Sequence, residues 1–310
     1  MKNLRRVVGL VLSVGGLFAS IYVLATQVDL AAAGRALGQA HRGWLLAAAG
    51  LSLLAPVLVG LKLMLVLRLV DFRAAWGRTA SAVLAAVTLN AVVPGRGGDF
   101  VRAAFLADEP GTLALLLGAV LVERLLDVFV LGVMALAASV GGGAGPVPWI
   151  AAATCVAALG SLGALGLGHK LPVRREAAER ASRAAKALVA RPGLTVAILA
   201  MTLVCWAGNI ASMDLALRAV GADIPTIEVV RATPIAVLTG ILPISVNGIG
   251  TRDAAMVYLL GALAPREQIV AGTFAYFLLN GWLLAALGVV ALGRESLRRV
   301  RRRADAARSG

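Results

Sequence analysis

The sequence predicts an all-α integral membrane bundle of about six full spans plus two opposed re-entrant broken-helix hairpins, arranged as a pseudo inverted repeat. Three observations predict this fold class: the composition of the 310 residues, the length of their apolar runs and the positions of their basic residues. The chain is 60% hydrophobic and 15% charged, with a mean hydropathy of +0.88, whereas soluble domains are roughly 25% charged. Aromatic residues are only 5% of the chain, so its apolar residues are mainly small or aliphatic and allow close helix packing in a bilayer.

Six apolar runs are long enough to cross a bilayer core of ~30 Å, which takes about 20 residues. They are 7–26, 44–67, 112–140, 148–168, 194–220 and 268–292. The first run is longer than the ~7 to 15 apolar residues of a signal peptide, so we expect it to be a retained span. Two further apolar stretches, 79–107 and 229–263, are each broken by Pro, Gly and charged residues, and neither half of either stretch is long enough to span.

The distribution of Lys and Arg predicts the orientation, because cytoplasmic segments carry the positive excess. With the N-terminus inside, the expected cytoplasmic segments are 1–6, 68–78, 169–193 and 293–310, and the expected external segments are 27–43, 141–147 and 221–228. The cytoplasmic segments hold 20 Lys and Arg and the external segments hold 2. Since the chain is Arg-rich and Ala-rich, we expect a multi-pass protein of the bacterial inner membrane with both termini cytoplasmic.

This orientation requires the two broken stretches to be hairpins that dip into the membrane from opposite faces. Stretch 79–107 has to enter and leave on the inside, and stretch 229–263 on the outside. Opposed broken helices in two halves indicate a transporter-like inverted repeat with its site between them. We therefore expect one membrane domain over 1–310, with halves 1–168 and 194–310 joined by the basic linker 169–193, which has the pattern of a cytoplasmic surface helix.

The first hairpin turns through PGRGGDFVR, residues 94–102. It contains the hinge residues Pro94, Gly97 and Gly98 and the charged residues Arg96, Asp99 and Arg102. We expect Asp99 to cap the returning half-helix, with both arginines near its positive N-terminus. Backbone N–H groups and guanidinium groups together favour binding of a phosphate or carboxylate at this turn.

The second hairpin turns through LPISVNGIGTRD, residues 242–253. Its hinge residues are Pro243, Gly248 and Gly250, and its charged residues are Arg252 and Asp253. Thr251 is expected to cap the next helix. For both hairpins an alternative stays open, because membrane helices tolerate Pro and Gly and an arginine can extend to the interface.

The run 112–140 carries Glu123, Arg124 and Asp127 near its middle. On a helix the three lie within an arc of about 100°. Exposing them to lipid would cost roughly 8 to 10 kcal/mol, so they have to face protein or a water-filled cavity. Two roles stay open: binding substrate, or pinning helices together. In other spans, Asn209 and Asn280 are further polar candidates, and Trp206 is expected to be a packing or belt aromatic.

In these three motifs the sequence resembles the flippase-like membrane family related to the transmembrane domain of lysyl-phosphatidylglycerol synthases. The matching residues are Pro94, Arg96, Gly98, Asp99 and Arg102; Glu123, Arg124 and Asp127; and Pro243, Gly248, Gly250, Arg252 and Asp253. Both turns carry Asp where the family is expected to have Glu. The resemblance covers nearly the whole chain and implies translocation of a polar-headgroup lipid, either an aminoacylated phospholipid or a polyprenyl-phosphate-linked sugar. Because the chain ends just past its last apolar run, we expect no aminoacyl-transferase activity.

The leading hypothesis is therefore a lipid flippase or scramblase, not an enzyme. Its arginines would bind an anionic or zwitterionic headgroup, and its carboxylates would position the arginines or bind a cationic group. The alternatives are an ion-coupled transporter of a small solute, a membrane glycosyl- or phosphotransferase, and a non-catalytic scaffold of a lipid or glycan assembly system. A transferase is disfavoured because the sequence offers neither an acidic repeat nor a His pair.

The expected partners are membrane lipids, together with glycosyltransferases or lipid-synthesis proteins. Nucleic acid is not expected despite the net charge of +14, because the basic residues follow the membrane topology. No cofactor and no metal site is expected. Cys155 and Cys205 lie in apolar runs, and His41 and His169 are far apart in sequence.

Overall fold

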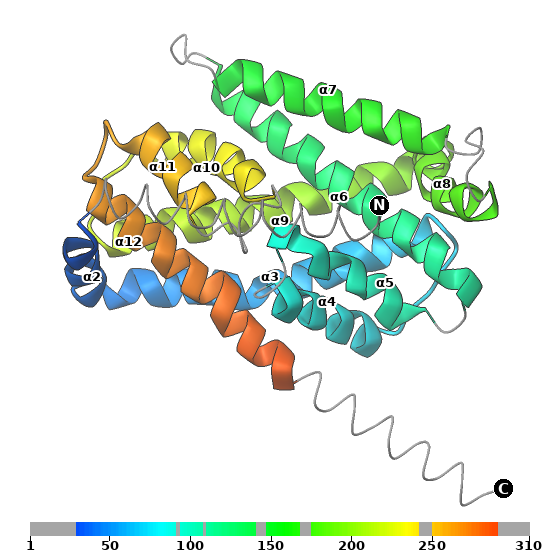
Figure 1. The fold of residues 1–310 in the computed structure, drawn as a ribbon, viewed down its shortest axis with the longest axis horizontal. Coiled ribbons are helices and arrows are strands. Elements are labelled where there is room, and N and C mark those ends of the chain that lie inside the picture. Colours follow the sequence, from blue (N-terminus) through cyan, green and yellow to red (C-terminus); the bar gives the residue numbers. More distant parts are fainter. Residues whose placement is uncertain are drawn as a thin grey trace, which may run out of the picture.

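The structure is a computed structural model that describes residues 29–90, 94–107, 110–140, 147–167, 175–241 and 250–290. The predicted first span 7–26 and the Arg-rich tail lie outside these ranges. Within them every regular element is helical (Figure 1). The elements are α2 (Leu30–Gly38), α3 (Arg42–Arg68), α4 (Trp76–Asn90), η1 (Pro94–Phe100, a 3-10 helix), α5 (Val101–Leu106), α6 (Pro110–Ala138), α7 (Val147–Gly166), α8 (Arg175–Ala190), α9 (Pro192–Ala219), α10 (Thr226–Ile241), α11 (Thr251–Leu260), α12 (Arg266–Phe277) and η3 (Leu278–Leu283, a π-helix).

Four of the described helices are long and apolar enough to cross a membrane: Arg42–Arg68, Val147–Gly166, Pro192–Ala219 and Arg266–Val290. Each covers one of the predicted runs, which confirms an all-α membrane fold. A fifth helix, α6, is 29 residues long but carries three charged residues in its middle. The short helix α2 was not predicted; it begins after Asp29, whose side chain accepts a hydrogen bond from the backbone N–H of Ala32 at 3.0 Å.

Helices α3 and α9 form an antiparallel pair along the long axis of the molecule (Figure 1). At one end the backbone N–H of His41 donates to the carbonyl of Ala219 at 2.7 Å. At the other end Arg191 donates to the carbonyl of Arg68 at 2.6 Å. Contacts at both ends align these two helices over nearly their full length.

Helices α3 and α9 are each followed by a backbone turn of the same type. A residue in the left-handed region follows each helix, Asp71 with φ 56° and Gly221 with φ 82°. The next N–H donates back to Leu67 in the first turn and to Leu217 in the second, both at 3.1 Å. Each of these hydrogen bonds satisfies a backbone carbonyl near the C-terminus of its helix. The two turns are separated by 150 residues in sequence.

A broken helical hairpin follows each of these turns. Helix α4 packs against η1 and α5 after α3, and α10 packs against α11 after α9. Because α3 and α9 are antiparallel, the two hairpins start from opposite ends of the pair (Figure 1). Helices α5 and α11 begin at Val101 and Thr251, again 150 residues apart.

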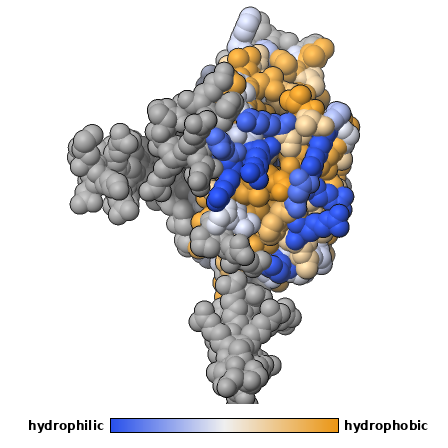
Figure 2. Space-filling view, turned by 90° about the vertical axis from the view of Figure 1, so that its right-hand side faces the viewer, coloured by the Kyte–Doolittle hydropathy of each residue, from blue (hydrophilic) through white to orange (hydrophobic). Residues whose placement is uncertain are grey.

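Helix α8 lies along one end of the bundle and packs on α6, α7 and α9. Its Ala184 and Ala185 are buried, whereas Arg183 and Lys186 are exposed, as expected for an amphipathic surface helix. Figure 2 faces the side of the molecule where α8 lies in Figure 1, and hydrophilic side chains gather on it. The described part of the predicted cytoplasmic linker and the turn after α3 therefore share one end of the bundle.

Candidate functional site

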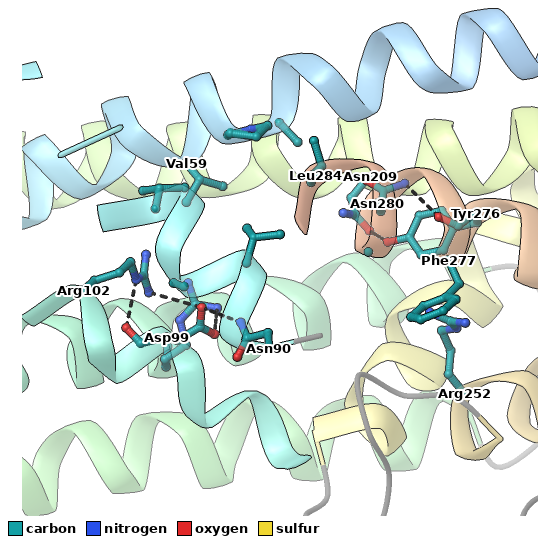
Figure 3. Close-up of a pocket in the computed structure, with 17 residues that line it drawn as sticks. Val59, Asn90, Asp99, Arg102, Asn209, Arg252, Tyr276, Phe277, Asn280 and Leu284 are labelled. Atoms are coloured by element: carbon teal, nitrogen blue, oxygen red, sulfur yellow. Dashed lines mark hydrogen bonds and ion pairs between the residues drawn. The ribbon is translucent and has the colours of Figure 1, made fainter. Parts of the chain in front are cut away.

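A cavity of about 150 Å³ lies between the two halves of the bundle. Residues from nine elements line it: Ala55, Pro56 and Val59 of α3, Val83, Ala86, Val87 and Asn90 of α4, Asp99 of η1, Arg102 of α5, Arg124 of α6, Asn209 of α9, Arg252 of α11, Tyr276 and Phe277 of α12, and Asn280 and Gly281 of η3, with Leu284 directly after η3. Figure 3 shows Asn90, Asp99 and Arg102 on one side of it and the residues from α9, α11 and α12 on the other. Asp99 and Arg102 of the first predicted turn and Arg252 of the second thus line one space.

On the first-half side the charged residues form a buried network around Glu123. Its carboxylate lies 3.1 Å from Lys62 Nζ, 3.1 Å from an Arg102 Nη atom and 3.2 Å from an Arg124 Nη atom. Asp127 in turn pairs with Lys62 at 2.6 Å and with Arg124 at 3.2 Å. Glu123 is 0% exposed, so its charge is compensated entirely by neighbouring cations rather than by water.

Asp99 completes this network at the edge of the cavity. It pairs with Arg124 at 3.1 Å and accepts a hydrogen bond from Asn90 Nδ2 at 3.1 Å. Three cations (Lys62, Arg102 and Arg124) and three carboxylates (Asp99, Glu123 and Asp127) therefore balance. Arg102 and Arg124 both line the cavity, and Arg124 is the more accessible of the two, with 23% of its side chain exposed against 1% for Arg102.

Gly98 lets η1 pack directly on α4. A Cβ atom at this position would lie 2.7 Å from Asn90 Oδ1 and 2.8 Å from the Ala86 carbonyl. The prediction that Asp99 caps the returning helix is wrong: the N-cap position of α5 is Phe100, which is already helical. Because η1 runs straight into α5, no new helix N-terminus forms at Asp99, and its carboxylate lies against Asn90 and Arg124.

On the second-half side Arg252 forms a smaller pair with its neighbour Asp253. The guanidinium contacts the Asp253 carboxylate at 2.8 and 3.1 Å and lies over the rings of Tyr276 and Phe277, 5.4 and 5.9 Å from their centroids. Arg252 is also 3.5 Å from the Thr273 carbonyl. A forked pair against aromatic faces fixes the direction of this guanidinium.

The break before α11 requires glycine at position 250, where φ is 85°. The prediction that Thr251 caps α11 is wrong, because Thr251 is the first helical residue and Gly250 occupies the N-cap position. The Asp253 carboxylate accepts a hydrogen bond from the backbone N–H of Gly250 at 3.1 Å, so it satisfies a backbone donor at the N-terminus of α11. Asp253 is therefore shared between the backbone and Arg252.

Two irregular helical segments border the cavity. Pro56 interrupts the hydrogen bonding of α3, and the π-helix η3 widens the extension of α12 around Asn280. Asn280 donates to Ser212 at 3.1 Å, and Tyr276 OH donates to Asn209. Both predicted polar candidates, Asn209 and Asn280, thus lie at the cavity, and π segments recur at functional sites.

The family description "Lysylphosphatidylglycerol synthase TM region" matches residues 6–288. The chain belongs to this family. The match extends through all three charged motifs, which agrees with the resemblance that the sequence indicates. Among curated proteins, none matches the chain.

In this family member Asp99, Arg102, Arg124 and Arg252 line the cavity. Glu123, Asp127 and Asp253 lie in contact with those arginines. Of the hinge residues, Gly97 and Gly98 lie in η1 and Gly250 precedes α11. Pro94 and Arg96 lie in η1. Pro243 and Gly248 lie outside the described residues.

Sequence reasoning missed three members of the site: Lys62, Asn90 and Trp206. Trp206 was expected only as a packing or belt aromatic, yet its Nε1 donates to Asp127 at 3.2 Å. Lys62 is 2% exposed and lies in the last third of α3. A lysine inside a long apolar run was itself a signal, since an ionised group at membrane depth needs a partner.

The cavity presents groups that can bind a charged molecule. In the described ranges, no group of three or more His, Cys, Asp or Glu residues is placed to hold a metal ion. The polar atoms that face the cavity are guanidinium, carboxylate, amide and phenol groups. Such a set can hold a charged group by ion pairing and hydrogen bonding inside an apolar bundle.

Proposed function

We propose that this protein is a lipid flippase or scramblase that holds a charged headgroup in the cavity between its two hairpins while the lipid moves between leaflets. The observation that carries the proposal is that arginines of both halves, Arg124 and Arg252, line one cavity inside an apolar membrane bundle. Since ionised groups at membrane depth are costly, they are typical of substrate pathways. Membership of a family tied to lipid synthesis supports a lipid as the transported molecule.

Arg252 is the leading headgroup ligand in this proposal. Its guanidinium has one carboxylate partner, Asp253, that also accepts a backbone N–H. A lipid phosphate can therefore compete with Asp253 for the guanidinium, because the Asp253 carboxylate would still accept the hydrogen bond from the Gly250 N–H. Arg124 would contribute from the opposite wall, with Asp99 beside it to contact a cationic part of a zwitterionic or aminoacylated headgroup.

The membrane arrangement that goes with this function is six spans and two re-entrant hairpins, with both termini cytoplasmic in a bacterial inner membrane. It is supported by hairpins that start from opposite ends of the antiparallel α3–α9 pair. Exposed positions Asp71 and Asp223 follow α3 and α9 and can be tested by single cysteines in a protein whose two native cysteines are replaced. Asp223→Cys should react with an impermeant maleimide in intact cells, and Asp71→Cys only after permeabilisation. The reverse pattern would contradict this arrangement.

The function is tested by leaflet exchange of a fluorescent phosphatidylglycerol in proteoliposomes, followed by chemical quenching of the outer leaflet. Wild-type protein should exchange the lipid faster than protein-free vesicles, and Arg252→Ala should remove most of the difference. Arg218→Ala is a matched control, because Arg218 pairs with Asp214 at 2.8 Å outside the cavity. A fluorescent polyprenyl phosphate in the same assay separates the two lipid classes.

Failure to exchange either lipid class would contradict the proposal. Gradient-driven uptake of a small solute, without lipid exchange, would instead support the ion-coupled transporter. If neither occurs, the non-catalytic scaffold of a lipid or glycan assembly system becomes the better hypothesis. The partners would then be sought among glycosyltransferases and lipid-synthesis proteins.

A further inference from the structure

An apolar groove of about 380 Å³ lies along the packed α3–α9 pair and adjoins the charged cavity. Its walls are aliphatic or small side chains, among them Leu51, Leu54 and Leu58 of α3 and Val204 and Gly208 of α9. Leu54 is 46% exposed and Val204 50% exposed, so the groove opens on the apolar surface of the bundle. In a membrane protein this surface meets lipid chains.

The groove and the charged cavity share part of their wall. Ala55, Asn209 and Asn280 line both spaces. Ala55 is small, and Asn209 accepts a hydrogen bond from Tyr276 OH at this boundary. A third space of about 110 Å³, which reaches Lys62 and Asp127, also borders Ala55 and Asn209. An apolar space and charged spaces thus adjoin across a partition of only a few side chains.

We infer that the groove binds the hydrocarbon chain of the lipid whose headgroup occupies the charged cavity. The inference rests on the proposed function and adds a chain-binding site to it. An amphipathic molecule matches this pair of spaces, because its apolar part gains by leaving water and its charged part gains by pairing with arginine. The lipid approaches from the apolar surface of the α3–α9 pair, and Asn209 lies at the junction of headgroup and chain.

Gly208 provides a substitution that blocks the groove without displacing the backbone. A Cβ atom at this position meets no heavy atom within 4 Å, so a larger side chain extends into the open groove. Gly160 on α7 has the same open surroundings but lies away from the groove. Gly208→Phe and Gly160→Phe therefore form a matched pair with equal added volume in a membrane helix.

The test uses the full chain in vesicles that contain phosphatidylglycerol with a photoreactive group near the end of one acyl chain. After illumination, mass spectrometry maps the crosslinked residues. Crosslinks are expected at 51–58 and 204–211. Excess unlabelled phosphatidylglycerol should lower the yield of these crosslinks by competition. Diacylglycerol, which lacks the charged headgroup, should leave the yield unchanged. Gly208→Phe should lower these crosslinks about tenfold, and Gly160→Phe should leave them unchanged.

Crosslinks at these segments that no lipid competes away, or that persist in Gly208→Phe, would overturn the chain-binding site. Competition by polyprenyl phosphate but not by phosphatidylglycerol would keep the site and assign it an isoprenoid chain. Leaflet exchange measured on the same vesicles separates the two proposals. Normal exchange without the expected crosslinks contradicts only the groove, and the expected crosslinks without exchange contradict only lipid transport.

Discussion

The two halves of the bundle carry an arginine at equivalent positions but surround it differently. Arg102 and Arg252 are each the second residue of the helix after a broken turn, and they are 150 residues apart. Arg102 pairs with the fully buried Glu123, at the position equivalent to Thr273. Arg252 instead meets the backbone carbonyl of Thr273 at 3.5 Å. The second half thus lacks the carboxylate on α12 that would hold its arginine.

A second equivalent pair follows the same pattern. Lys62 in α3 corresponds to Ser212 in α9 and joins the network around Glu123 and Asp127. Ser212 makes neutral hydrogen bonds to Ser52, Asn280 and the Ala48 carbonyl. In the first half the cations are thus mainly buried among carboxylates, whereas in the described part of the second half Arg252 contacts a single carboxylate, that of Asp253. Arg124 is the exception in the first half because it is partly exposed to the cavity.

The largest expected effect is at Glu123. Glu123→Gln keeps the shape but leaves Lys62, Arg102 and Arg124 with too few carboxylates, and uncompensated buried charge costs about 3 to 5 kcal/mol. The equivalent change in the second half, Thr273→Val, removes only a neutral hydroxyl and should cost about 1 kcal/mol. Thermal unfolding in detergent measures both. Equal losses of stability would break the comparison between the halves.

A smaller effect is expected at the two hairpin glycines, for different reasons. Gly98→Ala forces η1 away from α4, because its Cβ would lie 2.8 Å from the Ala86 carbonyl, and should cost about 1 to 3 kcal/mol. Gly250→Ala should cost about 1 to 2 kcal/mol, because alanine rarely adopts φ 85°. Gly160→Ala, with open space around it, controls for the loss of glycine in a helix. Unfolding of Gly98→Ala at the Gly160→Ala temperature would contradict the close packing of η1 on α4.

The smallest effect is expected at the ion pair that joins the two halves at the end near α8. Arg191 contacts Asp71 at 2.9 Å, but their side chains are 41% and 77% exposed. Solvent screens such a pair, so Arg191→Ala should change the free energy of unfolding by less than about 1 kcal/mol. Chemical unfolding with and without added salt measures it. A loss comparable to that of Glu123→Gln would show that this end, rather than the buried network, carries the electrostatic stabilisation.

The helices could be predicted closely from the sequence because a membrane span is a long apolar run. The run 44–67 became α3, Arg42–Arg68, and the run 194–220 became α9, Pro192–Ala219. The short α2 was missed because its nine residues form no long apolar run. An inverted repeat was predicted, but its offset of 150 residues was not, since many equivalent positions, such as Lys62 and Ser212, differ in chemistry. The offset emerges from the turns after α3 and α9 and from the starts of α5 and α11.

The charged motifs could be singled out from the sequence, but the partners of their side chains could not. The cost of charge in a membrane singled out Glu123, Arg124 and Asp127, whereas pairing with Lys62 depends on how α3 packs on α6. The two capping predictions failed because they assumed that a new helix starts at the acid or hydroxyl residue. Continuous η1 and α5 removed that start at Asp99, and Gly250 took the N-cap position before Thr251.

The central claim is that Arg252 binds the headgroup, whereas Arg102 stabilises the fold. The most direct test compares lipid exchange by Arg252→Lys and Arg102→Lys at equal amounts of folded protein. Lysine keeps the charge but loses the planar fork. Arg252→Lys should slow phosphatidylglycerol exchange about tenfold, equivalent to ~1.4 kcal/mol, while Arg102→Lys should mainly lower the melting temperature and leave exchange by folded protein near the wild-type rate. Equal exchange rates for wild type and Arg252→Lys, or loss of exchange only in folded Arg102→Lys, would contradict this division of roles.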